Sequence, residues 1–325
     1  MQNGMIAVSP QTEQSRRTAK SRKIRDIWAQ RTFFLVSLVP VFLFLAIVIA
    51  LLVKSWPILQ AQPLWELLSG KIWQPLKGSF GFLPFIAGTL WVTIVSMFLA
   101  VPPCLLTAIY LAEYAHPRTR SISKPIIDLL AAIPSVVYGV WGILAIVPVV
   151  KWLGPIFDQV LGFIPFFSNN NPTGFSILAG GIVLAVMVAP FIIAVTFEVL
   201  RTVPGGVREA SLAVGATKWQ TIRFAVLPHT LPGIIAGIGL GMSRSLGETM
   251  AVLMVVGNVA KMPNSIFDTA YPLPALIANN YGEMMSIPLY DSALLTAALL
   301  LLVIVLIFNI LSTLLLRRIT GKSKV

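Results

Sequence analysis

Long runs of uncharged, mostly apolar residues alternate with short basic segments along this chain. About 20 helical residues are enough to cross the roughly 30 Å hydrocarbon core of a bilayer. Five runs of this length carry no charge, and a sixth is interrupted only by Arg244 and Glu248. The pattern therefore predicts six transmembrane helices. They are Phe33 to Val53, Phe85 to Ala112, Leu129 to Val150, Phe175 to Phe197, Pro232 to Asn258 and Ser292 to Leu316.

The composition agrees with a membrane protein. Hydrophobic residues make up 57% of the 325 residues, charged residues make up 11%, and the mean hydropathy is +0.86. A chain with so little polar surface cannot coat a soluble globule of this size. We therefore predict an all-α fold, an integral membrane helical bundle. The net charge of +12 does not indicate nucleic-acid binding, because the basic residues lie in short segments between the apolar runs.

The distribution of Lys and Arg predicts the orientation of the bundle, since cytoplasmic segments carry the excess. Of the 24 basic residues, 18 fall on one side of the predicted helices and 5 on the other, and Arg244 is the remaining one. Both termini are therefore expected in the cytoplasm. The segment around Trp56 to Leu83 is rich in Trp, Pro and Gly, and we expect it outside, as an aromatic belt at the membrane interface.

Arg244 and Glu248 are the charges that fall within a predicted span. Each ionised group at membrane depth costs about 2.5 to 3.5 kcal/mol, and such groups are usually functional. On a continuous helix they share one stripe with Gly233, Gly237 and Gly241, and small residues spaced by four allow close helix packing. We expect both charges to point into the protein or across a subunit interface. Because they are four residues apart, they can also form a structural ion pair with each other.

The polar segment between the fourth and fifth spans is the second unusual feature. Glycines open it, and a short helical piece with Leu212 and Val214 follows. Gly215 then breaks the helix, and a second short piece carries Trp219 and Phe224. A segment that only joined two spans would not need two helices.

This segment resembles the signature of the permease subunits of binding-protein-dependent ABC importers. Five positions match at fixed spacing, whereas Ser211 and Ala225 depart from the signature by small or apolar replacements. The matching residues are Glu209, Ala210, Gly215, Leu227 and Pro228. The resemblance implies a fold like that of type I ABC importer permeases, in which residues 204–228, including Trp219, dock into a groove on a cytoplasmic ATPase. An ordinary interfacial amphipathic helix is the alternative.

The resemblance extends from about Leu83 to Leu316 and points to the phosphate-specific branch of this family. The stretches that carry it are Gly88-Thr89-Leu90, Ala108 to Tyr114, Ile133 to Gly139 and Arg244 to Val252. Met250-Ala251-Val252 resembles the PstC-type subunit and not its PstA-type partner. The resemblance implies an importer of inorganic phosphate in the bacterial plasma (inner) membrane. Its parts would be this permease, a homologous PstA-type permease, two ATP-binding subunits and an external phosphate-binding protein.

The predicted domains follow from the spans and the resemblance. Residues 1–31 are expected to form a basic cytoplasmic tail, and residues 32–84 the first transmembrane helix and the external segment. Residues 85–316 are expected to form the permease core with the coupling segment 204–228, and residues 317–325 a second cytoplasmic tail.

For the charged pair we predict a place in the substrate pathway. Arg244 offers a planar set of donors to an oxyanion, and Glu248 orients it. We also expect Glu248 to accept a hydrogen bond from a protonated phosphate oxygen and to repel fully ionised sulfate.

Other functions are weaker interpretations. Gly321-Lys322-Ser323 lacks the first glycine and the following helix of a nucleotide-binding loop, so ATP hydrolysis is expected from a partner chain. No catalytic set, cofactor or metal site is predicted, and His116 and His229 are expected in solvated or helix-end roles. The alternatives are an importer of another oxyanion, such as molybdate or sulfate, and an ion-coupled secondary transporter that uses Glu248 in a proton relay.

Overall fold

The computed structural model describes residues 10–169, 171–283 and 287–322, so the outer ends of both predicted tails lie outside it. The chain divides into two compact units, one up to Val53 and one from Lys54 onward. The first unit consists of the larger part of helix α1 (Pro10–Ala61). The second unit holds the other elements, which are helices apart from one short hairpin, β1 (Trp73–Gln74) with β2 (Ser79–Phe80).

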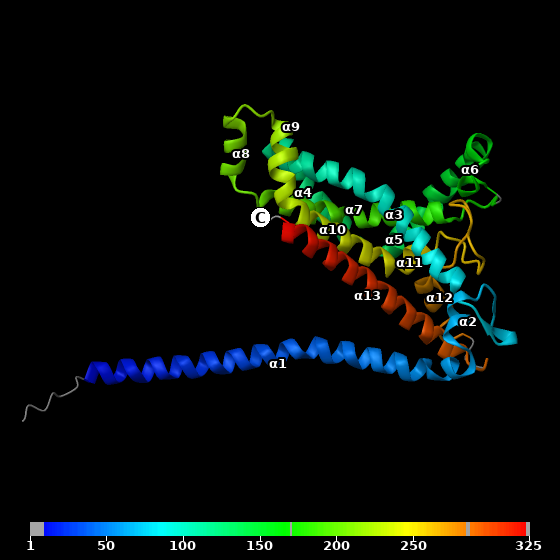
Figure 1. Cartoon of the computed structure of the whole chain (residues 1–325), viewed down its shortest axis with the longest axis horizontal. Helices are drawn as coiled ribbons and strands as arrows, with labels where there is room; N and C mark the ends of the chain where they lie inside the picture. Colours follow the sequence, from blue (N-terminus) through cyan, green and yellow to red (C-terminus); the bar gives the residue numbers. More distant parts are fainter. Residues whose placement is uncertain (1–9, 170, 284–286, 323–325) are drawn as a thin grey trace, which may run out of the picture. The chain divides into compact units, whose positions relative to one another are not determined.

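The helices of the second unit lie side by side in Figure 1, with α8 and α9 at one end and α2, α6 and α12 at the opposite end. The helices are α2 (Leu64–Ser69), α3 (Leu83–Ile109), α4 (Pro117–Ala132), α5 (Ser135–Trp141), α6 (Val147–Leu161), α7 (Ile177–Arg201), α8 (Gly205–Ala213), α9 (Lys218–Thr221), α10 (Leu227–Leu246), α11 (Met250–Leu253), α12 (Leu273–Asn280) and α13 (Tyr290–Lys322). Shorter helical turns are the 3-10 turns η1 (Pro75–Lys77) and η4 (Pro165–Phe167) and the π-helical turns η2 (Tyr110–Tyr114), η3 (Gly142–Ile146) and η5 (Ile222–Val226).

Among the described residues, six helical segments are long and apolar enough to cross a membrane, which confirms the predicted number of spans. Each predicted span overlaps one of them. The segments are Arg25–Ala61, Leu83–Tyr114, Ser135–Leu161, Ile177–Arg201, Lys218–Leu246 and Tyr290–Arg318.

The start of the third span was predicted wrongly. Residues 129–132 belong to the preceding helix α4, and the chain is extended at Ile133 (φ −64°, ψ 130°) and Pro134 (φ −59°, ψ 140°). A residue before proline is forced away from the helical region by the proline ring. The apolar run therefore contains a break at Ile133-Pro134, and the span begins at Ser135.

The end of the fifth span was also predicted wrongly. Helix α10 ends at Leu246, and Gly247 follows with φ −91° and ψ −1°. The chain then forms the short helix α11 and a loop in which Gly257 has a φ of +89°, a value that favours glycine. The run from Thr249 to Asn258 is therefore apolar because it is buried in the bundle, and it does not continue the membrane-crossing helix.

Two of the long segments contain a wide π-helical turn just before a proline. Turn η3 is followed by Val147-Pro148, and turn η5 by Leu227-Pro228. Proline has no N–H to donate, and its ring clashes with the carbonyl four residues earlier. A wider turn separates these groups and lets the helix continue. For this reason α9, η5 and α10 form one continuous helical segment, Lys218–Leu246, where the sequence had suggested a separate short helix.

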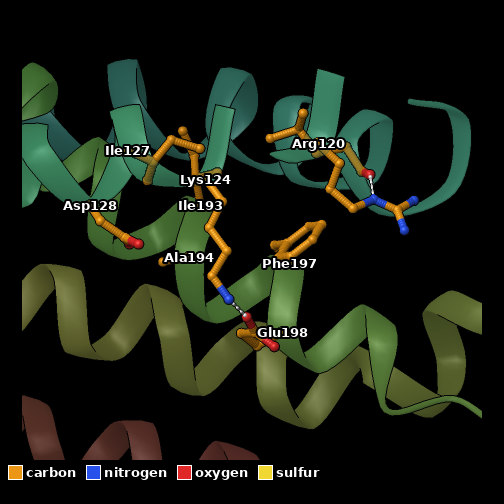
Figure 2. Close-up of a pocket in the computed structure, with 9 residues that line it drawn as sticks. Arg120, Lys124, Ile127, Asp128, Ile193, Ala194, Phe197 and Glu198 are labelled. Atoms are coloured by element: carbon orange, nitrogen blue, oxygen red, sulfur yellow. Dashed lines mark hydrogen bonds and ion pairs between the residues drawn. The ribbon is translucent and has the colours of Figure 1, made fainter. Parts of the chain in front are cut away.

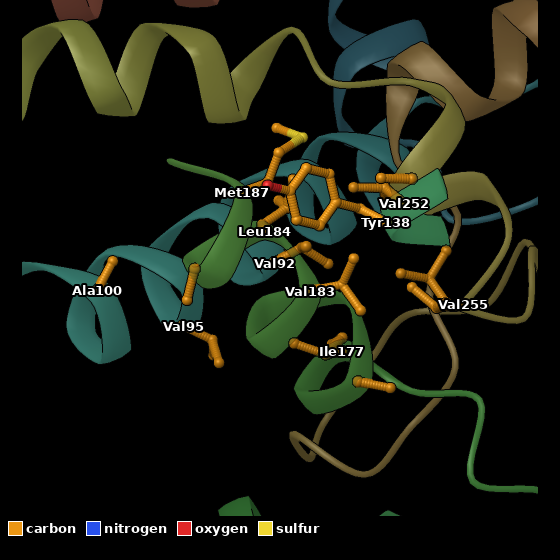
Figure 3. Close-up of a cluster of buried hydrophobic side chains, with 14 of the residues drawn as sticks. Val92, Val95, Ala100, Tyr138, Ile177, Val183, Leu184, Met187, Val252 and Val255 are labelled. Carbon is orange, nitrogen blue, oxygen red and sulfur yellow. The ribbon is translucent and has the colours of Figure 1, made fainter. Parts of the chain in front are cut away.

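Three apolar clusters hold the second unit together. The largest joins α3, α5, α7 and α11 with the loop around Phe267, and Figure 3 shows Val92 of α3 beside Val183 and Leu184 of α7. The second joins α3, α12 and α13 to the external segment, where Trp73 packs against Phe80 and Phe85 with ring centroids 5.5 and 4.9 Å apart. Trp73 is thus part of a packed cluster, whereas Trp65 is exposed, as expected of an interfacial belt.

The glycine stripe of α10 packs closely against α7, as the spacing of the small residues predicted. A Cβ atom at Gly233 would lie 2.5 Å from Val199 Cγ1, and one at Gly241 would lie 2.8 Å from Ile192 Cγ1. These distances leave no room for a methyl group. Glycine therefore sets how near the two helices can approach each other.

Gly233→Ala is expected to destabilise the protein, because its new methyl group must displace Val199. We expect a loss of about 1 to 3 kcal/mol in the free energy of unfolding, measured by denaturant titration in mild detergent with tryptophan fluorescence. The control is Gly206→Ala in α8, where no atom lies within 4 Å of the added Cβ. Equal stability of Gly233→Ala and the wild type would show that the helices can separate freely.

Candidate functional site

Arg244 lies in the last turn of α10, beside α7. Its guanidinium carbon is 4.2 Å from the ring centroid of Phe191, a half-buried residue of α7. A cation over an aromatic face is attracted by the ring quadrupole, and a positive charge suits the C-terminal end of a helix. Within the described part of the chain, no hydrogen bond or ion pair occupies the N–H groups of Arg244. The side chain is exposed in the single chain, so these donors are available to a ligand.

Glu248 does not lie on the same helix as Arg244, because α10 ends two residues earlier. Its Oε1 atom accepts a hydrogen bond from the backbone N–H of Ala251 at 3.4 Å, which caps the first turn of α11. The ion pair between Arg244 and Glu248 that the spacing allowed is absent, since the ion pairs of the described residues are Lys124–Glu198 and Arg208–Glu113. The prediction of a shared helical stripe was therefore wrong for Glu248. Arg244 and Glu248 are independent charges in this structure.

A cavity of about 10 Å³ lies beside Glu248, between α3, α7, α10, α11 and α12. This volume is close to the minimum that holds one water molecule. Thr89, Thr93 and Ser245 contribute hydroxyl groups to its lining. The Ser245 hydroxyl is buried and has no hydrogen-bond partner among the residues described. Glu248 thus borders a small polar space in an otherwise apolar core.

The segment between α7 and α10 forms the predicted helix, break and second helix. Helix α8 ends near Gly215, whose φ of +84° is a conformation that favours glycine. Thr217 then begins α9 with a capping box: its side chain accepts from the Gln220 N–H, and the Gln220 side chain accepts from the Thr217 N–H. A contact of 3.0 Å between the hydroxyls of Ser211 and Thr221 joins the two helices.

The residues of this segment that match the family signature differ in exposure. Glu209, Ala210, Gly215 and Pro228 are exposed, whereas Leu227 is half-buried. Four large apolar side chains of the same segment are also exposed, Leu212 (50%), Val214 (85%), Trp219 (49%) and Phe224 (69%). A group of exposed apolar residues on two adjoining short helices is typical of a surface that a partner covers.

Sequence reasoning missed the partner of Arg208. This residue of α8 forms an ion pair with Glu113 in η2, with Nη2 2.7 Å from Oε1. The Glu113 side chain is only 7% exposed. The two residues are 95 positions apart, so no local spacing indicated their contact. The available signal was an isolated acidic residue at the end of the second span.

A cavity of about 30 Å³ lies between α4 and α7 near the same end of the bundle. Figure 2 shows Lys124 of α4 reaching Glu198 of α7, with 2.6 Å between Nζ and Oε1. Both side chains are more than half exposed, so this ion pair contributes little to stability. Arg120 donates from Nε to the Leu111 carbonyl at 3.0 Å and from Nη2 to the Ala112 carbonyl at 2.8 Å, which holds α4 against the end of α3.

His116 lies at the start of a helix, whereas His229 is exposed within the continuous helical segment Lys218–Leu246. His116 Nδ1 accepts from the Arg118 N–H at 3.3 Å and so begins α4. His229 Nδ1 lies 2.8 Å from the Ala225 carbonyl. Within the described residues, no group of His, Cys, Asp and Glu side chains is arranged to hold a metal ion.

The fold and the exposed two-helix segment together define a membrane transport permease. A family model described as the inner membrane component of binding-protein-dependent transport systems matches residues 104–321. The chain belongs to this family.

Curated relatives and solved structures agree with this assignment. The phosphate transport system permease protein PstC of Xylella fastidiosa (strain Temecula1) is 35% identical over 313 residues, which cover 94% of this chain and 96% of the relative. PstC of Haemophilus influenzae is 34% identical over 92% of this chain and 97% of the relative. A crystal structure of a bacterial alginate ABC transporter, 19% identical, matches with a TM-score of 0.62 over 92% of this chain and 97% of that chain. The structure of the MetNI methionine ABC transporter, 23% identical, matches with a TM-score of 0.51 over 71% and 93%. These structures show the fold of a type I importer permease.

Double-mutant cycles test the arrangement around Arg244. We expect Arg244→Gln and Phe191→Leu to couple by about 0.5 to 1 kcal/mol, because the two side chains are in contact. Arg244→Gln and Glu248→Gln should show a smaller coupling free energy, because these residues form no ion pair. The free energies of unfolding are measured by denaturant titration in mild detergent. A larger coupling for Arg244 with Glu248 would contradict the structure.

Proposed function

We propose that this chain is the permease subunit of an ATP-driven importer of inorganic phosphate, and that it forms the translocation pathway with a homologous permease. The observation that carries the proposal is the 35% identity to a PstC permease along nearly the whole of both chains. The open donors of Arg244 support it, because an oxyanion needs such a group within an apolar bundle.

Arg244 is proposed to bind the phosphate anion during its passage. The guanidinium carbon lies 4.2 Å from the centroid of the Phe191 ring, and a guanidinium can donate two parallel hydrogen bonds to an oxyanion. A lysine would provide only a flexible point charge at this position. Because Glu248 does not neutralise Arg244, the guanidinium keeps its full charge for the anion.

Glu248 is proposed to select phosphate over sulfate. Phosphate keeps a proton near neutral pH and can donate a hydrogen bond to a carboxylate. Sulfate is fully ionised and is repelled by it, so the same carboxylate acts oppositely on the two anions. The hydrogen bond from the Ala251 N–H holds Glu248 near the end of α10, where its side chain lines the small polar cavity.

The segment 204–228 is proposed to dock on a cytoplasmic ATPase subunit. Trp219, Leu212 and Val214 would enter a groove of that subunit, with Glu209 and Ala210 on the same segment. The end of the bundle with α8 and α9 would then face the cytoplasm, and the excess of basic residues supports the same side for both termini. The complete transporter would contain a PstA-type permease, two ATP-binding subunits and an external phosphate-binding protein.

Arg244→Ala is expected to lower phosphate uptake strongly. Loss of a hydrogen bond to a charged group costs about 1.5 to 3 kcal/mol, which corresponds to a roughly 10- to 150-fold loss of affinity. Arg244→Lys should keep part of the activity. In Glu248→Gln we expect sulfate to compete with phosphate, which the wild type should not allow.

The measurement is uptake of radiolabelled phosphate into proteoliposomes that contain the partner subunits and the binding protein, with arsenate, sulfate and molybdate as competitors. Wild-type rate and affinity in Arg244→Ala would exclude its proposed role. Continued rejection of sulfate by Glu248→Gln would exclude the selectivity mechanism. Stronger competition by molybdate than by phosphate itself would favour the other-oxyanion alternative, and uptake driven by a proton gradient without ATP would favour a secondary transporter.

Trp219→Ala is expected to weaken the association with the ATPase subunits. A buried interface tryptophan typically contributes more than about 2 kcal/mol, so we expect an affinity loss on the order of 30-fold. Co-purification of the ATPase subunits with a tagged permease measures this. The matched control is Trp152→Ala, because Trp152 is 69% exposed on α6, at the opposite end of the bundle. Equal retention of the ATPase by both variants would place the docking surface elsewhere.

A further inference from the structure

The Arg208 guanidinium joins three separate elements of the bundle. Nε lies 3.3 and 3.2 Å from the two carboxylate oxygens of Glu113, and Nη2 donates to Oε1 at 2.7 Å. Nη1 donates to the Val203 carbonyl at 2.7 Å, and Nη2 also donates to the Leu200 carbonyl at 3.0 Å. All three nitrogens are therefore used. The contacts connect α8 to the end of α3 through η2 and to the last turn of α7.

A contribution to the stability of the fold does not by itself explain why this ion pair is present. Replacing a buried pair by apolar residues is often neutral or stabilising, whereas removing one partner leaves a costly buried charge. The geometry of this pair is nevertheless well defined, because the planar guanidinium of Arg208 donates hydrogen bonds to both carboxylate oxygens and to two backbone carbonyls. The exposed Lys124–Glu198 pair has no such set of contacts.

The two short helices are attached to the bundle in different ways. Helix α9 continues through η5 into α10, so a movement of α9 reaches Arg244 along one helix. Helix α8 has no buried residue, and it ends at Ala213, two residues before Gly215 with its φ of +84°. Helix α8 packs on η5 and contacts α9 through the Ser211 and Thr221 hydroxyls, and both η5 and α9 belong to the fifth span. Its polar link to α3 and α7 is Arg208, beside Val207, which packs on the apolar cluster of Leu111, Leu200 and Val226.

We infer that Arg208 and Glu113 are positioning residues that transmit the displacement of α8 to α3 and α7. This inference rests on the proposed docking of segment 204–228 on an ATPase. Helix α7 carries Phe191, which supports Arg244, and α3 carries Thr89 and Thr93, which line the cavity beside Glu248. The ion pair therefore gives α8 a route to both proposed substrate contacts that does not pass through α10. The coupling follows contiguous packed elements.

Glu113→Gln tests the inference, because glutamine keeps the size of the side chain and removes its charge. We expect the variant to bind the ATPase subunits at wild-type stoichiometry, since Glu113 is not on the exposed docking surface. Phosphate transported per ATP hydrolysed should fall several-fold, because the ATPase cycle continues while α3 and α7 follow it poorly. Both quantities are measured in proteoliposomes with the partner subunits and the binding protein. The matched control, Glu198→Gln, breaks the exposed ion pair with Lys124 and should leave the ratio unchanged.

The outcomes separate this inference from the proposed function. If the wild-type chain binds no ATPase subunit, the proposed function fails. If Glu113→Gln assembles and keeps the wild-type ratio, or if uptake and hydrolysis fall in proportion, the pair has only a structural role and the inference is overturned.

A second design covers the case in which Glu113→Gln does not fold. Glu113→Cys and Arg208→Cys, combined with Cys104→Ala, leave no buried charge and allow a bifunctional thiol reagent to bridge the two positions. We expect a low transport-to-hydrolysis ratio before bridging and recovery of the ratio after it. A ratio that is equally high before bridging, or that stays low after it, would contradict transmission through this contact.

Discussion

The close approach of α10 to α7 is the contact on which the rest of this site depends. In a lipid environment helices gain little from apolar burial against each other, so they associate mainly through tight packing. Gly233, Gly237 and Gly241 supply that packing, because their missing side chains admit Val199, Val195 and Ile192. The same approach brings Arg244 over the ring of Phe191. A guanidinium within an apolar bundle thus has a support that leaves its hydrogen-bond donors open.

The two charges near the end of α10 are held by different means. Arg244 is at the end of a helix, where the helix dipole favours a cation, and its guanidinium carbon lies over an aromatic ring. Glu248 follows the helix end and caps the next short helix. This separation matters for the proposed function, because a self-neutralising pair would offer neither charge to an anion. The break at Gly247 therefore matters as much as the charges themselves.

Where the bundle meets α8, by contrast, the two charged side chains are paired with each other. Here Arg208 donates to Glu113 and to the carbonyls of Leu200 and Val203 at the end of α7, so each of its three nitrogens already has a partner within the protein. The exposed side of the same segment carries Leu212, Val214 and Trp219. One side of the segment is thus attached to the spans, and the other is the proposed docking surface. A segment that passes movement from one protein to another would need both properties.

The sequence by itself determined the membrane class, the number of spans and the two-helix segment with its glycine break. These features depend on local properties: the length of apolar runs, the backbone freedom of Gly215, and the matching positions from Glu209 to Pro228. The glycine stripe was predictable for the same reason, since helical periodicity is local. The tertiary structure alone decided where the helices end and which charges meet. The run from Thr249 to Asn258 is as apolar as a span, but it is buried among other elements, and Glu113 meets Arg208 across 95 positions. Burial and long-range pairing depend on how distant segments pack, and no short stretch of sequence contains that information.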